Sequence, residues 1–361
     1  MTTPVDIPEQ RVAPLDGLRA IAVLIVMVSH AGLEHIIPGG FGVTIFFFLS
    51  GYLITTLLRV ETAKTGSVSL TGFYLRRTVR IIPPMMICIA VTVALAELDL
   101  FGRSINLDGL PLDILFLTNY ADQIGVASQI PIPLWSLDVE EHFYLVFPLV
   151  FIATQTGSIE RTRNWIVLSL GAILLLRTVL YFTLNDISNL YYWTHTRIDS
   201  ILYGCLLAVW NNPSMKDRVR IGSGIGWLAL GVALILFCFV VRDTFFREVI
   251  RYSVQGLALL LVFNFVLRDG GLIARALSNR LLKIVGDYSY VLYLIHVPLL
   301  ALATTQLTAF PRPAASAIGF ILSFAFAAAM HRLVERPLMI WRKEFQKRMR
   351  LPQAALPKGV E

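Results

Sequence analysis

Residues 15–30 read LDGLRAIAVLIVMVSH, and this stretch decides the fold class. It is apolar apart from Asp16, Arg19 and the closing pair Ser29 and His30. A helix needs about 20 mostly apolar residues to cross the hydrocarbon core of a membrane. The stretch therefore predicts a first membrane-spanning helix, and one that carries ionisable side chains.

The composition extends this character to the whole chain of 361 residues. Hydrophobic residues make up 56% of it and charged residues 15%, with a mean hydropathy of +0.69. Soluble domains carry about 25% charged residues, so the composition excludes an ordinary soluble enzyme, a disordered chain and a disulfide scaffold. We predict an all-α fold, a polytopic helical bundle in the lipid bilayer.

About ten apolar stretches are long enough to be membrane-spanning helices. They cover approximately residues 14–31, 40–58, 81–97, 134–154, 164–184, 197–211, 221–241, 249–267, 284–302 and 314–333. A shorter apolar piece, Leu110–Tyr120, contains Asp113 and is too short to cross, so we expect a short re-entrant or interfacial helix there. The cysteines Cys88, Cys205 and Cys238 fall in apolar stretches, where we expect core residues and no metal site.

The distribution of basic residues predicts the orientation. An even number of spans puts both termini on one side, and cytoplasmic loops are rich in Lys and Arg. With both termini in the cytoplasm, about 23 of the 31 Lys and Arg residues fall on that side. We therefore expect a multi-pass protein of the cell (cytoplasmic) membrane, whose net charge of +7 reflects topology and requires no nucleic-acid partner.

This topology divides the chain into three parts. Residues 1–13 form a cytoplasmic N-terminal segment without the pattern of a cleaved signal peptide. Residues 14–335 form the transmembrane domain, and residues 336–361 form a basic cytoplasmic tail that includes WRKEFQKRMR.

Ionisable residues inside a membrane are costly, and they are functional candidates by default. Arg19 and His30 are eleven residues apart, which places both on one face of a helix with an axial separation of about 16 Å. In the predicted orientation Arg19 lies near the cytoplasm and His30 in the outer half. The alternative is a helix-end ion pair between Asp16 and Arg19, with His30 as a structural histidine.

The third apolar stretch opens with FYLRRTVRIIPP, residues 73–84. Arg77 and Arg80 are three residues apart and share a helical face, and Arg76 adds a third cation. Planar guanidinium groups match phosphate oxygens in a bidentate manner. This favours a phosphate-binding role, whereas the alternative is anchoring to anionic lipid.

The fourth stretch opens with LWSLDVEEHFYLVFP, residues 134–148. Glu140 and Glu141 lie just inside its predicted outer end, and Glu140 shares a face with Tyr144. Trp135 beside these carboxylates is a pairing typical of sugar-binding sites. The alternative is an interfacial aromatic belt with a charge pair at the helix N-terminus. Asp138 and His142 share a second face and form a candidate pair.

Weaker signals occur further along the chain. The segments THTRIDSILYG and GDYSYVLYLIHVP bring further ionisable residues into or beside spans. These residues are His195, Arg197 and Asp199 in the first segment, Asp287, Tyr290, Tyr293 and His296 in the second, and Arg177 in the middle of another span. For each of them taken alone, a structural hydrogen bond inside the bundle is the favoured interpretation.

Taken together, five motifs resemble the acyltransferase-3 family of integral membrane O-acyltransferases. Arg19 and His30 match its first-span signature, and Arg77-x-x-Arg80 matches its Arg-x-x-Arg motif. The other three are FGVTIFFFLSGYLI (residues 41–54), WSLDVEEHFY (135–144) and SYVLYLIHVP (289–298). The motifs occur in the family's order and cover the chain from about Leu15 to Pro337. His142 departs from the Gln that the family often has.

The resemblance implies transfer of an acyl group, most often acetyl, from acyl-coenzyme A to a hydroxyl of a sugar. It implies that Arg19, Arg77 and Arg80 bind the donor's phosphates. His30 and Glu140 are then the catalytic candidates, with His30 as the base or as the carrier of the acyl group. The candidates for binding the acceptor are Trp135, Tyr144, Glu141 and His296.

The expected acceptor is a glycan or glycolipid, such as an exopolysaccharide or lipopolysaccharide sugar. Family members often carry an extra extracytoplasmic domain, whereas this sequence predicts a stand-alone transferase core. The competing class is a proton-coupled transporter of a polar solute, which also needs buried Arg, His and Glu. Against a transporter stand the lack of a visible internal repeat and of Gly/Pro-broken helices at matched positions. The sequence leaves the acceptor, the acyl chain and the oligomeric state open.

Overall fold

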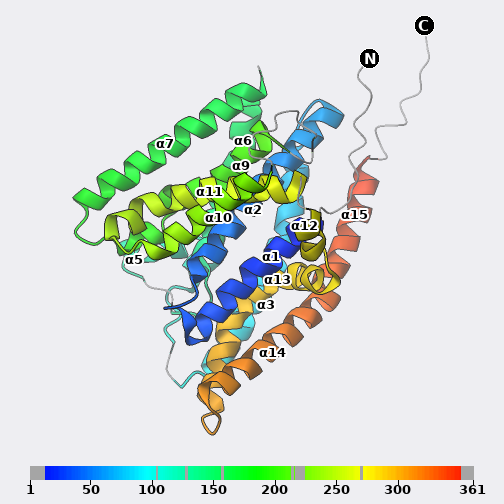
Figure 1. Cartoon of the computed structure of the whole chain (residues 1–361). Helices are drawn as coiled ribbons and strands as arrows, with labels where there is room; N and C mark the ends of the chain where they lie inside the picture. The colour runs from blue at the N-terminus through cyan, green and yellow to red at the C-terminus, as the bar shows by residue number, and fades with distance from the viewer. Residues whose placement is uncertain are drawn as a thin grey trace. The chain divides into compact units, whose positions relative to one another are not determined.

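The computed structural model describes residues 13–102, 105–126, 129–155, 158–212, 215, 224–268 and 271–350, with only the backbone of 343 and 346–350. The expected N-terminal segment, apart from residue 13, and the tail from 351 onward lie outside these residues. Helices account for all the regular structure of the described residues (Figure 1), which confirms the predicted all-α fold.

Seven helical segments are long and apolar enough to cross a membrane. They are α1 with the π-helical turn η1 (Ala13–Leu33), α2 (Gly39–Thr65), α3 (Leu70–Glu97), α7 (Ile159–Thr183), η5 with α11 (Phe246–Arg268), α13 (Arg280–Gln306), and α14 (Arg312–Met330) continued to Arg342. Each lies on a predicted span, so the multi-pass character is confirmed.

The other three predicted spans are helical as well. Helix α6 (Trp135–Gln155) has 21 residues but carries three carboxylates near its start. Helices α9 (Asp199–Trp210) and α10 (Ile225–Val240) are apolar but have only 12 and 16 residues. At 1.5 Å per residue, α9 is about 18 Å long, shorter than the hydrocarbon core.

The short apolar piece before α6 forms only brief turns. Helix α4 (Leu110–Ile114) is followed by the 3-10 turn η2 (Thr118–Tyr120) and by α5 (Ala121–Ile124). Asp113 is buried and accepts a hydrogen bond of 2.9 Å from the Thr118 hydroxyl. The predicted short helix is therefore present in two pieces, because the chain turns at Phe116, whose φ of 60° is left-handed, between α4 and η2.

The chain divides into two compact units, described separately below. The first contains residues 1–68 and 105–289, and the second contains residues 69–104 and 290–361. The boundary falls inside α13, between Ser289 and Tyr290.

In the first unit, α2 crosses α9 at a very short backbone distance. A Cβ atom added to Gly51 would collide with the carbonyl of Ile201, and one added to Gly204 would collide with the carbonyl of Phe48. Small residues let membrane helices approach in this way, because dispersion contacts replace the hydrophobic effect there. Helices α10 and α11 form an antiparallel hairpin beside this pair (Figure 1).

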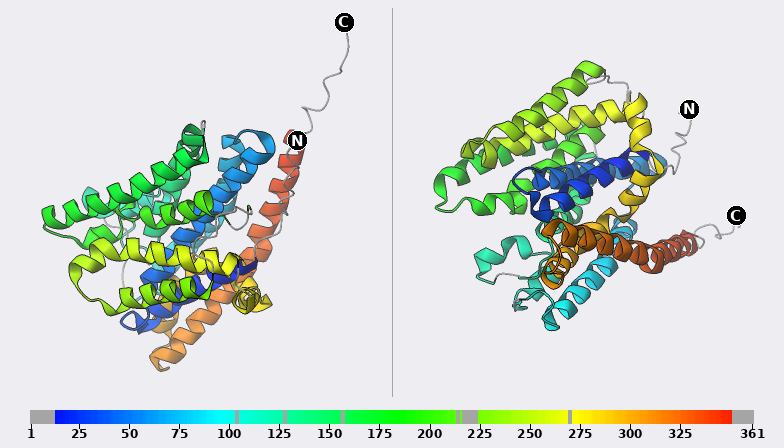
Figure 2. Two further views of the ribbon diagram at one scale, coloured as in Figure 1. Left: turned by 45° about the horizontal axis from the view of Figure 1, so that its top comes forward. Right: turned by 60° about the horizontal axis from the view of Figure 1, so that its bottom comes forward.

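In the second unit, α3, α14 and the later part of α13 pack together (Figure 2). The Tyr290 hydroxyl donates a 2.9 Å hydrogen bond to the carbonyl of Ile81, and Gly319 brings α14 against Leu300. Helix α14 continues through the π-helical turn η6 (His331–Glu335) into α15 (Arg336–Arg350), which packs on α3. Part of the expected basic tail is thus a regular helix.

Candidate active site

His30 lies where the first helix breaks. The π-helical turn η1 (Ser29–Leu33) follows α1 (Ala13–Val28) and ends because Gly32 adopts a φ of 91°, a conformation that favours glycine. The His30 side chain is exposed, and its Nδ1 lies 3.0 Å from the carbonyl oxygen of Val26. A carbonyl oxygen only accepts, so in the neutral ring Nδ1 carries the hydrogen and Nε2 keeps the lone pair. In this neutral tautomer Nε2 is the nitrogen that can accept a proton.

Arg19 lies eleven residues before His30, about three turns earlier on the same helix. Its guanidinium is 3.5 Å from the carboxylate of Asp16, which is buried. The structure therefore contains the helix-end ion pair that the sequence offered as an alternative. The Arg19 side chain keeps 23% of its surface exposed, so the ion pair leaves room for a second contact.

Glu140 belongs to a hydrogen-bonded triangle between α2 and α6. The Ser50 hydroxyl donates to its Oε1 at 2.8 Å, and the Tyr144 hydroxyl lies 2.9 Å from Oε2 and 3.0 Å from the Ser50 oxygen. Two hydroxyl donors satisfy a charge that would be expensive inside a span. The sequence predicted that Glu140 and Tyr144 share one face of a helix. It gave no reason to select Ser50, which is a single serine in an apolar stretch.

The register of α1 against α2 separates this triangle from His30. Gly39 contacts Ser29, and Gly42 contacts Ala22 and Val26, so the two helices run antiparallel. Ser50 lies eleven residues beyond Gly39, which is about 16 Å along α2. Glu140 is therefore closer in height to Arg19 than to His30, and this spacing disfavours direct orientation of His30 by Glu140.

Trp135 forms one side of an aromatic cage around Arg197. The Arg197 guanidinium carbon lies 3.9 Å from the Tyr252 ring centre, 4.9 Å from that of Tyr191 and 5.8 Å from that of Trp135. Arg197 is completely buried, and its hydrogen bonds to the Tyr191 carbonyl and the Thr44 hydroxyl are both long, at 3.4 Å. Cation–π contacts thus contribute much of its stabilisation.

Tyr191 remains a neutral neighbour of this cation. Burial raises the pKa of Tyr191 to about 12, although the positive charge of Arg197 opposes the rise. The phenol therefore stays protonated at neutral pH and does not neutralise Arg197. Among the described residues, Arg197 has no carboxylate ion-pair partner.

The neighbouring ionisable residues have mostly structural partners. Arg177 pairs with Asp199 at 2.7 Å, both fully buried, and donates to the Thr196 carbonyl and the Ser253 hydroxyl. Asp138 accepts from the Asn119 amide at 3.0 Å, while His142 lies 2.7 Å from the Thr194 hydroxyl. Asp138 and His142 therefore have different partners and do not form the candidate pair. Glu141 is half-buried.

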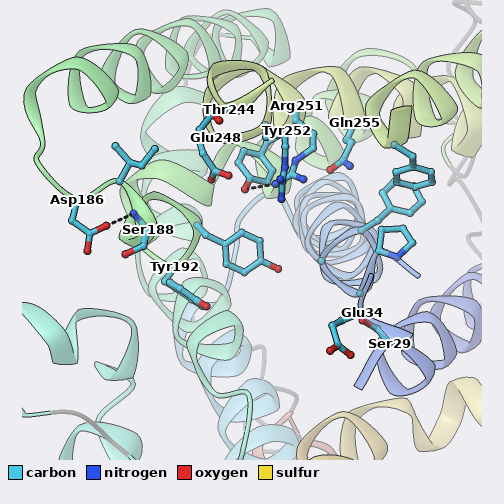
Figure 3. A pocket seen from close by; sticks show the side chains of 18 residues that line it. Ser29, Glu34, Asp186, Ser188, Tyr192, Thr244, Glu248, Arg251, Tyr252 and Gln255 are labelled. Atoms are coloured by element: carbon cyan, nitrogen blue, oxygen red, sulfur yellow. Dashed lines mark hydrogen bonds between the residues drawn. The ribbon is translucent and has the colours of Figure 1, made fainter. Parts of the chain in front are cut away.

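A cavity of about 530 Å³ adjoins the break in the first helix. Ser29 and Glu34, on either side of His30, line one wall, and Tyr252 and Arg251 line the opposite wall (Figure 3). The other polar side chains at the cavity are Asp186, Ser188, Thr244, Arg247, Glu248 and Gln255, and the tyrosines Tyr191 and Tyr192 complete its aromatic lining. Aromatic walls with a few converging polar groups are typical of small-molecule sites.

Two charged residues at this cavity make hydrogen bonds to their neighbours. The Arg251 guanidinium donates a 3.0 Å hydrogen bond to the Tyr252 hydroxyl. At the rim, the Ser188 amide donates to Asp186 at 2.8 Å and lowers the pKa of that exposed carboxyl. Sequence patterns did not predict this cavity, because its walls come from three separate stretches of the chain, 29–41, 186–192 and 239–255, that only tertiary packing brings together.

Three predicted site residues belong to the second unit. The Arg77 guanidinium carbon lies 5.9 Å from the Phe73 ring centre, and Arg80 is exposed. His296 is completely buried, and its Nδ1 lies 2.9 Å and 2.8 Å from two backbone carbonyls of its own helix. The remaining predicted residues, from Arg19 to Tyr144, belong to the first unit.

An acyltransferase domain matches residues 12–332, nearly the whole stretch that carries the five motifs. The chain belongs to the acyltransferase-3 family. This confirms the resemblance seen in the sequence.

Curated relatives of this family member carry O-acetyltransferase names. The O-acetyltransferase OatA of Staphylococcus aureus (strain NCTC 8325 / PS 47) is 29% identical over 345 residues, which cover 90% of this chain and 56% of OatA. A candidate O-acetyltransferase of S. aureus (strain MRSA252), SAR0937, is 30% identical over 367 residues, 96% of this chain and 60% of that protein. The chain thus spans little more than half the length of these relatives. No solved structure matches it.

Proposed function

We propose that the protein is a membrane O-acyltransferase that moves an acyl group, by default acetyl, from cytoplasmic acyl-coenzyme A to a sugar hydroxyl. The acceptor in this proposal is an extracytoplasmic or membrane-linked glycan or glycolipid. Family membership and the names of the relatives support the reaction class. The observation that carries the proposal is the position of His30, at a helix break beside a cavity with aromatic and charged walls.

The proposal places the protein in the cell (cytoplasmic) membrane with both termini in the cytoplasm. The excess of Lys and Arg in the segments assigned to that side supports this orientation. Arg19, Arg77 and Arg80 then lie towards the pool of acyl-coenzyme A, and the cavity near His30 lies towards the outer side. Guanidinium groups fit the donor's phosphates, which they can bind in a bidentate manner.

The tautomer of His30 fits proton transfer from the acceptor. Nε2 takes the proton of the attacking hydroxyl, whose oxygen forms a bond to the thioester carbonyl carbon. The carbon–sulfur bond breaks, and the coenzyme A thiolate takes up the proton. If His30 carries the acyl group instead, Nε2 attacks the thioester carbonyl carbon and the coenzyme A thiolate leaves. The acceptor hydroxyl then attacks the acyl-imidazole, the carbon–nitrogen bond breaks, and the proton of the hydroxyl is released to the thiolate or to water.

The acceptor site in this proposal has two parts. The cavity presents tyrosine rings and charges of both signs next to the helix break, which suits a sugar with one apolar face and several hydroxyls. Trp135 contacts the cavity wall through Tyr191, and Tyr144, Glu141 and His296 remain proposed acceptor residues. Because of its distance from His30, we expect Glu140 to act on substrate positioning rather than on the proton.

The test is a transfer assay with purified protein in liposomes, acetyl-labelled acetyl-coenzyme A and a cell-surface glycan fraction. We expect label on the glycan with the wild-type protein and none with His30→Ala, while both proteins remain in the membrane. Active His30→Ala would remove His30 from the mechanism. Uptake of a polar solute into the same liposomes without any donor would instead support the transporter.

A further inference from the structure

Two side chains that line the cavity hold hydrogen-bond donors close to the first turn of α2. The Thr44 hydroxyl lies 3.3 Å from Oε1 of Gln255 and 3.1 Å from the carbonyl oxygen of Gly40. The amide oxygen of the buried Gln255 therefore faces Thr44, and its nitrogen Nε2 is directed away. The Tyr191 hydroxyl lies against Gly40, because a Cβ atom added there would be 2.5 Å from its oxygen. Neither Nε2 nor the Tyr191 hydroxyl has a hydrogen-bond partner among the residues that the structure describes.

The surroundings of these two donors are positively polarised. Helix α2 begins at Gly39, its first turn lines the cavity, and no described side chain caps its N-terminus. A helix N-terminus carries about half a positive charge. The guanidinium of Arg197 is 3.4 Å from the Thr44 hydroxyl, and this arginine is completely buried. Its Nε atom has no hydrogen-bond partner within the described part of the chain.

Carboxylates at the same cavity do not satisfy these groups. Three of them line it, those of Glu34, Asp186 and Glu248. Within the described residues, none accepts a hydrogen bond from Gln255 or Tyr191, and none forms an ion pair with Arg197. Asp186 lies on the far side of the cavity from Gln255 (Figure 3). A buried cation without a counter-ion is costly, so this corner of the cavity suits an oxygen that gains negative charge.

We propose that Tyr191 and Gln255 form the oxyanion site of the acyl transfer, in which their O–H and N–H groups donate to the acyl carbonyl oxygen as it gains negative charge. This inference rests on the proposed function. Attack on the carbonyl carbon moves the π electrons of the C=O bond onto the oxygen. Their return expels the coenzyme A thiolate, or the imidazole of His30 if His30 carries the acyl group. Donors that are fixed in place before the reaction stabilise such a charge strongly.

The position of the donors fits the acyl carbonyl better than a neutral sugar hydroxyl. Gly39, beside Gly40, approaches the Ser29 hydroxyl, and Ser29 directly precedes His30. The donors therefore lie at the same end of α1 as the proposed base. Burial raises the pKa of Tyr191 to about 12, so its hydroxyl keeps the proton that it donates. The positive potential of the helix N-terminus and of the buried arginine favours a negative oxygen over a neutral one.

The transfer assay in liposomes tests the site when kcat and KM are measured for both substrates. Tyr191→Phe removes the hydroxyl but keeps the ring against Arg197, and Gln255→Met removes the amide at a similar volume. We expect kcat to fall about 100- to 1000-fold in each variant. The KM for acetyl-coenzyme A should change little, because the lost hydrogen bond strengthens only in the transition state. Tyr181→Phe is the control, since Tyr181 packs on phenylalanines away from the cavity.

Three results would overturn the oxyanion site, and they differ from one another. Tyr191→Phe and Gln255→Met with the kcat of the control would show that neither group acts on the transition state. A raised KM for the glycan with an unchanged kcat would assign both groups to acceptor binding. A wild type that transfers no acyl group would refute the proposed function and, with it, this inference.

Thr44 is a positioning residue in this proposal, because it orients the Gln255 amide. Thr44→Val removes the hydroxyl at nearly constant shape, so the amide can turn and present its oxygen to the cavity. We expect kcat to fall about tenfold, the effect of one hydrogen bond, and Thr44→Ser to retain most of the rate. Thr44→Val should cause no further loss in a Gln255→Met background. Equal kcat for Thr44→Val and Thr44→Ser, or a further loss in that background, would overturn this orientation of Gln255.

Discussion

The Tyr144 hydroxyl and the Ser50 hydroxyl both lie within hydrogen-bond distance of the Glu140 carboxyl group. Tyr144→Phe keeps the ring but removes a hydrogen bond to a charged group, so we expect a loss of about 1.5–3 kcal/mol in stability. Thermal unfolding in detergent measures this. Tyr181→Phe is a suitable control, because that ring packs on Phe182 and Phe245. An unfolding temperature as high as that of the control would show that the triangle does not stabilise the fold.

The ion pair between Arg177 and Asp199 is fully buried, at 2.7 Å. Removal of one partner leaves an uncompensated charge, and we expect Arg177→Met to cost about 3–5 kcal/mol. The double variant Arg177→Met/Asp199→Leu should recover part of that loss, since it buries no charge. Unfolding in detergent compares the three proteins. A double variant less stable than Arg177→Met would contradict this interpretation.

The sequence predicted contacts between candidate residues where these residues share one helix. Glu140 and Tyr144 are four residues apart, and their contact follows from helical periodicity. Ser50, Tyr252 and Arg251 were missed because their neighbours come from distant segments. The heights of Glu140 and His30 in the bundle depend on helix register, which hydropathy does not encode.

At the scale of the helices, the close crossing of α2 and α9 depends on two glycines. Gly51→Ala and Gly204→Ala each place a methyl group against the backbone of the other helix, so both should destabilise the protein strongly. Gly171→Ala in α7 is the control, because a Cβ there meets nothing within 4 Å. It should be neutral, or stabilising by up to about 1 kcal/mol. Equal unfolding temperatures for all three variants would show that the helices can separate freely.

Helix positions were predicted better than helix lengths. All ten apolar stretches contain a helix, but α2 continues to Thr65 and α13 begins at Arg280, beyond the apolar limits. Polar residues continue a helix outside the hydrocarbon, where hydropathy no longer marks it. Helix α15 was predicted only as a basic tail, because its amphipathic pattern RPLMIWRKEFQKRMR has too little apolar length for a span.

At the scale of the whole molecule, the proposed mechanism depends on the predicted orientation of the protein in the membrane. Lys64 lies at the end of α2 on the predicted cytoplasmic side, and Asp243 lies on the predicted outer side, between α10 and η5. We expect a membrane-impermeant thiol reagent to label Asp243→Cys in intact cells, and Lys64→Cys only after permeabilisation. The native cysteines are buried, so background labelling should be low. The reverse pattern would invert the topology and separate the arginines from the donor.

The central claim is that His30 serves the transfer of an acyl group to a surface glycan. The most direct measurement is mass analysis of surface glycans from wild-type cells, deletion cells, and deletion cells that express either wild-type protein or His30→Ala. We predict an ester that is lost on deletion, restored by the wild-type protein and absent with His30→Ala at equal membrane levels. Restoration of the ester by His30→Ala, or glycans unchanged by the deletion, would contradict the claim.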